Sequence, residues 1–173
     1  MKATTSMDFV TRPPRVLLTA LAGLCAVSVA LLAVGLSSAT AASEKIVSVP
    51  GNQPWTDTGV ALTQGEAVTI SASGTIKWGS SSPLDSPVGR TFGQLNGKAG
   101  TCGSVAYAGG SPFPAPGVNC YSMLFKIGSS GIAFPTGKKI SFTSPVAGEL
   151  FLGVNDTFFG DNTGSWSATI TTP

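Results

Sequence analysis

The sequence has no histidine and few charged residues. Its 173 residues include no histidine, 10 lysines and arginines, and 8 aspartates and glutamates. Without histidine, the Ser-His-Asp and Cys-His arrangements of many hydrolases cannot form. A chain with so few cations also lacks the basic surface that marks nucleic-acid-binding proteins. The composition therefore excludes these classes, and no phosphate-binding motif is present.

The only long apolar run lies near the N-terminus. Arg12 and Arg15 precede a run over residues 16–36, and small residues follow it up to Ala41. This order is typical of a signal peptide that is cleaved after Ala41. Because the run is long enough to cross a bilayer, an uncleaved N-terminal anchor is the alternative. We expect a signal peptide over residues 1–41 and a secreted, extracellular domain over residues 42–173.

The expected domain has no net charge and two of the three cysteines. Its seven cationic side chains balance seven acidic ones, so the net charge of +2 belongs to the leader. An even number of cysteines in an exported chain favours a disulfide, here between Cys102 and Cys120. Two buried thiols are the alternative. By chain entropy the disulfide would contribute about 3 kcal/mol to stability.

No segment after residue 41 has a helical period, whereas several short runs alternate between apolar and polar residues. The pattern predicts strands at about 45–49, 58–62, 66–73, 75–78, 123–128, 139–143, 148–154 and 165–172. Eight short strands favour an all-β, single-domain β-sandwich of the jelly-roll type. Residues 79–122, rich in glycine and proline, form a long irregular excursion of the kind that is functional or disordered.

A short acidic loop near the C-terminus is the strongest functional signal. It joins an apolar strand to an alternating one and carries four oxygen-bearing side chains within eight residues: Asn155, Asp156, Asp161 and Asn162. Carboxylate and amide oxygens on a tight loop suit a hard cation such as calcium. The alternative is a simple hairpin turn, in which Asp161 hydrogen-bonds to its own backbone.

Three segments resemble the PA-I galactophilic lectin-like family. Residues 55–74 are similar to its opening strands, residues 125–128 to its central strand, and residues 148–170 to its calcium-loop hairpin. The resemblance covers about residues 50–172, with a different middle loop. It implies a jelly-roll-like, galactose-binding-like sandwich with one calcium ion that coordinates two sugar hydroxyls directly.

The resemblance also implies a set of metal ligands. Asp156 matches the family's aspartate, and Asp161 and Asn162 match its two consecutive amides, with Asp161 replacing the first. The backbone carbonyl of Trp78 matches that of an earlier aromatic residue. The loop is two residues shorter than in the galactose-binding members, and the family's threonine ligand has no clear match. The histidine and glutamine that contact the sugar also have no counterparts, so the resemblance does not extend to galactose specificity.

Side chains of the same loop are the candidates for sugar contact. Phe158 and Phe159 offer apolar rings for the C–H face of a sugar, and Asn155 offers a polar contact. In a tight turn, at least one of the two phenylalanines is expected to face solvent. Trp55 is a further stacking candidate, whereas Trp166 is expected in the core.

The remaining charges do not indicate catalysis. Asp156 and Asp161 could form a glycosidase pair, but two carboxylates in one hairpin loop more naturally face one cation. We therefore expect no enzyme, and we interpret Lys126 and Arg90 as solvated charges.

The sequence thus predicts a secreted, lectin-like domain that binds carbohydrate or a glycoconjugate with calcium as cofactor. No nucleic-acid partner is expected, and the membrane is contacted only through an uncleaved N-terminal segment. The alternative is a non-catalytic structural or adhesion β-sandwich that has lost sugar binding.

Overall fold

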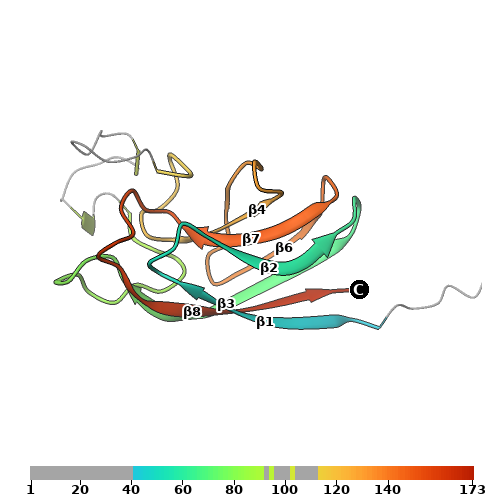
Figure 1. The fold of residues 1–173 in the computed structure, drawn as a ribbon, viewed down its shortest axis with the longest axis horizontal. Helices are drawn as coiled ribbons and strands as arrows, with labels where there is room; N and C mark the ends of the chain where they lie inside the picture. Colours follow the sequence, from blue (N-terminus) through green and yellow to red (C-terminus); the bar gives the residue numbers. More distant parts are fainter. Residues whose placement is uncertain (1–40, 92–93, 96–101, 104–112) are drawn as a thin grey trace, which may run out of the picture. The chain divides into compact units, whose positions relative to one another are not determined.

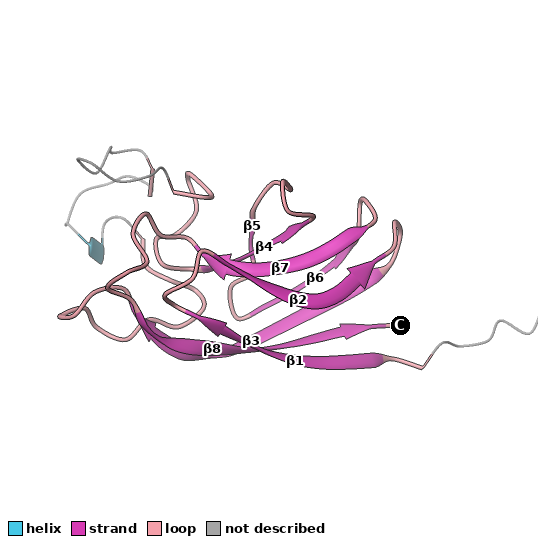
Figure 2. Ribbon diagram, in the orientation of Figure 1, coloured by secondary structure: helices cyan, strands magenta, loops and turns pink. Residues whose placement is uncertain are grey.

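The chain folds as two antiparallel sheets that face each other (Figure 1). The computed structural model describes residues 41–91, 94–95, 102–103 and 113–173. The strands are β1 (Ser43–Pro50), β2 (Trp55–Leu62), β3 (Ala67–Lys77), β4 (Met123–Ile127), β5 (Phe134–Pro135), β6 (Lys139–Thr143), β7 (Gly148–Val154) and β8 (Thr163–Thr172). One sheet has the order β1-β8-β3-β6 and the other β2-β7-β4-β5. Apart from a short helical piece at residues 94–95, the described segments are strands and loops (Figure 2).

The core lies between the sheets because alternate residues of each strand are apolar. In β8, Trp166, Ala168 and Ile170 are buried, and the serines and threonines between them lie on the other face. β7 contributes Leu150 and Leu152 in the same way. Each large apolar side chain that is fully buried stabilises the fold by about 1.5–3 kcal/mol. The expected single-domain β-sandwich is confirmed, as is the place of Trp166 in its core.

One strand, β3, replaces the two strands predicted at 66–73 and 75–78. Gly74 lies inside it, opposite Trp166, with a φ of 91°. A Cβ at Gly74 would lie 3.0 Å from the carbonyl oxygen of Ser165, so glycine allows β3 and β8 to stay paired here. The prediction placed a break because glycine usually punctuates strands. β5 was not predicted, because it has two residues and one of them is a proline at a sheet edge.

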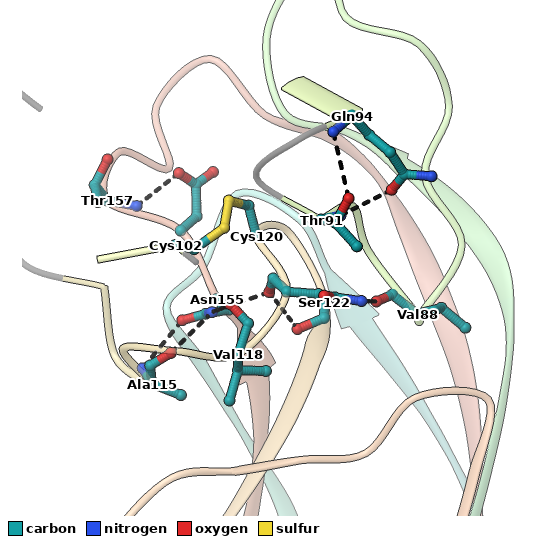
Figure 3. Close-up of a disulfide and its surroundings, with 12 residues drawn as sticks. Val88, Thr91, Gln94, Cys102, Ala115, Val118, Cys120, Ser122, Asn155 and Thr157 are labelled. Carbon is teal, nitrogen blue, oxygen red and sulfur yellow. Dashed lines mark hydrogen bonds between the residues drawn. A yellow bond between two sulfur atoms is a disulfide. The ribbon is translucent and has the colours of Figure 1, made fainter. Parts of the chain in front are cut away.

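A disulfide fastens the described parts of the long loop between β3 and β4. Cys102 and Cys120 are bonded, with their Cα atoms 5.3 Å apart and both side chains buried (Figure 3). The predicted crosslink is therefore confirmed. The two cysteines pack with Phe113, Tyr121 and Trp78 in a second apolar cluster. The rest of the predicted excursion lies partly outside the described residues.

The predicted signal peptide lies, except for its last residue, outside the described residues. Where the structure does describe the chain, it contains no helix with the length and apolar character needed to cross a membrane. Cleavage after Ala41, and the alternative of an anchor, stay predictions.

Candidate functional site

The acidic loop covers residues 155–162 and joins β7 to β8. Both of its ends are fixed by backbone hydrogen bonds. At the β7 end, the N–H of Asn155 donates to the carbonyl of Ser122 over 2.9 Å. At the β8 end, the N–H of Gly51 donates to the carbonyl of Gly164 over 3.0 Å. The loop therefore projects from an end of the sandwich where the backbone on both sides is held by hydrogen bonds.

Asp156 organises the loop from a buried position, with 4% of its surface exposed. Its Oδ1 accepts hydrogen bonds from the backbone N–H groups of Thr157 (2.6 Å) and Phe158 (3.2 Å). Its Oδ2 accepts a hydrogen bond from Nδ2 of Asn162 over 2.8 Å. Among the described residues it is thus Asp156, rather than Asp161, that bonds the backbone of the turn.

Asn162 carries a buried oxygen that lacks a hydrogen-bond partner. Its Nδ2 donates to the carbonyl of Gly51 and to Oδ2 of Asp156, each over 2.8 Å. Both partners are acceptors, so the amide nitrogen must face them and Oδ1 must point away. Within the described segments, Oδ1 is buried without a partner. Leaving such a group unpaired typically costs about 1–3 kcal/mol, which a cation at this oxygen would offset.

Asp161 and the peptide link between Trp78 and Gly79 lie close to each other. Oδ2 of Asp161 is 3.4 Å from the position that a Cβ on Gly79 would take. The carbonyl of Trp78 belongs to this same peptide link. The charge of Asp161 also acts on the Asp156 carboxyl. The structure therefore brings Asp156, Asp161 and Asn162 together, with the Trp78–Gly79 peptide beside Asp161.

Burial raises the pKa of Asp156 above its ordinary value near 3.8. Hydrogen bonds from Asn162 and from the N–H groups of Phe158 and Thr157 lower this pKa, and the negative charge of Asp161 raises it. The net direction is upward because burial, the largest effect, disfavours the charged carboxylate. A bound cation would favour the ionised form and reverse the shift.

The oxygens of the site are of the types that calcium prefers. Calcium takes six to eight oxygens from carboxylates, amide and backbone carbonyls, and water or ligand hydroxyls. Asp156 and Asp161 can supply carboxylates, and Asn162 and Trp78 can supply carbonyl oxygens. Across the described ranges, no group of three or more Asp, Glu, Cys or His side chains could hold a metal, so a cation here would need the amide and backbone carbonyls beside the two carboxylates. Two carboxylates suit the weak affinity of extracellular modules, with a Kd of about 10⁻⁴–10⁻³ M.

The two phenylalanines of the loop differ in their surroundings. Phe158 is 64% exposed, and its ring lies over Gly160, where a Cβ would come within 3.1 Å of Cζ. Phe159 is half-buried and packs against the main core. The expectation that at least one of them faces solvent is confirmed. Phe158 is the ring that a ligand can reach, and Phe159 anchors the loop.

Comparison with known proteins finds a lectin of similar structure. A solved structure described as "EclA N-terminal domain; PllA-like lectin" matches with a TM-score of 0.54 and 25% sequence identity. The match covers 75% of this chain and 96% of that one. No family model and no curated protein matches the chain. The chain is therefore similar to a lectin domain over nearly the whole length of that domain.

Asn155 does not face solvent, in contrast to its predicted role in sugar contact. It is fully buried, and its Oδ1 accepts a hydrogen bond from the N–H of Ala115 over 3.0 Å (Figure 3). Its Nδ2 donates to the carbonyls of Ala115 (3.2 Å) and Asn119 (3.0 Å). We therefore assign Asn155 a structural role, in which it fastens the segment 113–119 to the end of β7.

The sequence did not predict a cluster of polar and aromatic side chains that lies near the loop. The rings of Trp78 and Tyr121 stack at 4.2 Å with an interplanar angle of 1°. Buried Asp85 pairs with Arg90, so Arg90 is not the solvated charge that was predicted. Burial raises the pKa of Asp85, whereas the positive charge of Arg90 lowers it. The indole N–H of Trp166 donates to the carbonyl of Asp85 over 3.1 Å, which ties the group to the core.

Lys126 is also not a solvated charge, because only 9% of it is exposed. Its Nζ lies 4.4 Å from the ring centroid of Trp55 and 5.5 Å from that of Phe151, and it donates to the carbonyl of Ser129. Burial lowers the pKa of Lys126. Trp55 is thus engaged by a cation of its own chain, which makes it a poor candidate for stacking on a sugar.

Proposed function

We propose that this chain is a secreted carbohydrate-binding domain whose sugar recognition depends on calcium. The similarity to a lectin domain over 96% of that domain supports carbohydrate binding. The calcium dependence rests on one observation: a buried, unpaired oxygen of Asn162 lies on the same amide that bonds the buried carboxylate of Asp156. A cation at this oxygen would offset the cost of leaving it unpaired, and the negative charges of Asp156 and Asp161 would favour that cation.

Each residue of the site then has a distinct role. Asp156 and Asp161 would neutralise the ion, and Asn162 and the Trp78 carbonyl would add neutral oxygens. The bound ion supplies positive charge and free coordination positions for sugar hydroxyls. Phe158 offers its exposed ring to the apolar face of the sugar, and Phe159 holds the loop in place.

Export is supported by the crosslink as well as by the leader. Disulfides form and persist in oxidising compartments, and this domain has a buried one between Cys102 and Cys120. The apolar run that precedes the domain is then a cleaved signal peptide or, in the alternative, an anchor that keeps the domain outside the cell.

A structural or adhesion module without sugar binding is the second candidate. The hydrogen bonds of Asp156 favour it, because this carboxylate already fixes the loop by bonding Thr157, Phe158 and Asn162. In that case the loop would be a self-sufficient turn and would gain nothing from calcium.

A glycan-array screen of the exported protein, in millimolar calcium and in excess chelator, tests the proposal. We expect binding that is present with calcium, absent with chelator, and absent in Asp156→Ala. Phe158→Ala should weaken glycan binding while calcium binding is kept, whereas Phe134→Ala, which removes another exposed ring, should change neither. Binding that persists in chelator would overturn the calcium dependence, and no binding in either condition would favour the structural module.

A further inference from the structure

Tyr121 has a backbone conformation that bulky residues rarely adopt. Among the described residues other than glycine, it alone has a positive φ, of 55°. For a non-glycine residue this conformation is unfavourable by about 1–3 kcal/mol and persists only where the surrounding structure enforces it. The side chain is 6% exposed, so its position is fixed by packing.

The backbone around Tyr121 is held from several directions. Its own N–H donates to the carbonyl of Asn155 over 2.7 Å. The preceding residue, Cys120, exchanges two backbone hydrogen bonds of 2.9 Å with Arg90 and forms the disulfide to Cys102. Gly89 lies so close that a Cβ there would stand 2.3 Å from the carbonyl oxygen of Cys120. These contacts together can hold the strained conformation.

In this backbone conformation, the ring of Tyr121 lies flat against the ring of Trp78. The two rings are parallel to within 1°, with centroids 4.2 Å apart. The backbone of Trp78 is held separately, because its N–H donates to Oγ of Ser82 over 2.9 Å. With its ring and its N–H both fixed, Trp78 has little freedom to turn about its Cα. Rotation of its carbonyl about the Cα–C bond is limited from the other side, because the carbonyl of Gly79 accepts hydrogen bonds from the N–H (3.1 Å) and Oγ (3.0 Å) of Ser82.

We propose that Tyr121, clamped by the Cys102–Cys120 disulfide, is a positioning residue of the cation site. It acts through Trp78: the stacked rings aim the Trp78 carbonyl, and this sets the affinity for calcium. The inference rests on the proposed calcium function and adds that calcium affinity depends on the oxidised disulfide. Residues that orient metal ligands without binding the metal themselves typically change metal affinity by roughly 10–100-fold when they are removed.

Calorimetric calcium titration of chelator-stripped protein tests the proposal with two substitutions. Tyr121→Gly removes the ring but suits the positive φ, so the backbone strain is relieved rather than increased. We expect its Kd for calcium to rise roughly 10–100-fold. Tyr121→Phe keeps the stacked ring, so its Kd for calcium should stay near that of the native protein, even where the loss of the hydroxyl lowers the melting temperature. If Tyr121 had only a structural role, Tyr121→Gly would lower the melting temperature in chelator, but the two variants would have the same Kd for calcium.

Two further measurements complete the test. Phe134→Ala removes a ring that stacks on Phe125 at 5.5 Å, in β5, and should leave the Kd unchanged. Reduction of the native protein should weaken calcium binding, and a count of free thiols verifies that the disulfide is open. This measurement tests the proposal even if the Tyr121→Gly variant fails to fold. An unchanged Kd in folded Tyr121→Gly, or in the reduced protein, would overturn this inference alone. A native protein that binds no calcium would overturn the proposed calcium function, and this inference with it.

Discussion

Calcium should raise the melting temperature of the exported protein by a predictable amount. A ligand that binds only the folded state stabilises it by RT ln(1 + [L]/Kd). With a Kd of about 10⁻⁴–10⁻³ M, expected for two carboxylates, 10 mM calcium lies about 10–100 times above the Kd. The stabilisation is then about 1.4–2.7 kcal/mol. For a domain of this size, such a gain raises the melting temperature by roughly 4–12 °C.

The size of this rise should depend on pH in a defined direction. Because burial raises the pKa of Asp156, the folded, metal-free protein binds a proton there more readily than the unfolded chain does. Its stability therefore falls as the pH rises from the ordinary value near 3.8 through the raised folded pKa. Calcium competes with that proton. The rise in melting temperature should thus be large at neutral pH and small near pH 4.

Thermal unfolding followed by circular dichroism, with calcium and with chelator, measures the effect. Asp156→Ala should abolish the rise while the protein still unfolds cooperatively. Asp161→Asn keeps an oxygen at its position and should keep a smaller rise, because one charge is lost. A melting curve that 10 mM calcium leaves unmoved in the native protein would refute the reasoning, since even the weak limit of about 1 mM predicts a measurable shift.

Three other expectations concern two buried side chains and the covalent state of the exported protein. Asn155→Ala leaves the buried groups it bonds unpaired, so it should cost about 1–3 kcal/mol equally with and without calcium; a loss of glycan binding without a loss of stability would contradict its structural role. Lys126→Met removes the cation over Trp55 and should destabilise by about 0.5–2 kcal/mol in urea titrations, whereas an unchanged midpoint would show the contact to be neutral. Intact mass of the exported protein should begin at Ala42 and lack two hydrogens for the disulfide, while a full-length, membrane-bound chain would support the anchor.

The sheets could be predicted from the sequence because their signal is local. Alternation in β3, β6 and β8 follows from one apolar and one polar face, and each pattern can be seen within a few residues. The disulfide could be predicted from the even count of cysteines after the expected signal peptide. The sequence predicts two strands where the structure has β3, because the continuity of β3 depends on a neighbouring strand. Gly74 continues β3 where Ser165 and Trp166 of β8 lie close to it.

The environments of individual side chains could not be predicted, since they depend on contacts between distant segments. Asn155 is an amide beside an aspartate in a loop, which indicates a surface residue until the segment 113–119 is seen to lie against it. Lys126 and Arg90 were interpreted as solvated because their partners, Trp55 and Asp85, lie on other elements or beyond a turn. No spacing in the sequence encodes these pairs.

The long excursion contributes one described segment to the surroundings of the acidic loop. Asn155 binds the segment 113–119 to the end of β7, next to the acidic loop. This segment carries no charged side chain. Any contact between this segment and a sugar at the proposed site would therefore come from backbone groups and uncharged side chains.

Reciprocal coupling between sugar and calcium follows from a shared ion and separates a sugar site from a merely structural calcium. If sugar hydroxyls complete the coordination shell, each ligand must raise the affinity for the other by the same factor. A saturating glycan identified on the array should then lower the Kd for calcium, and the same factor should appear when calcium is saturating and the glycan is titrated. A structural ion held by Asp156 and Asn162 alone would bind with the same Kd in the presence and absence of the glycan. Calcium binding without this coupling would leave the loop as a stabilised turn and would place the sugar elsewhere on the domain.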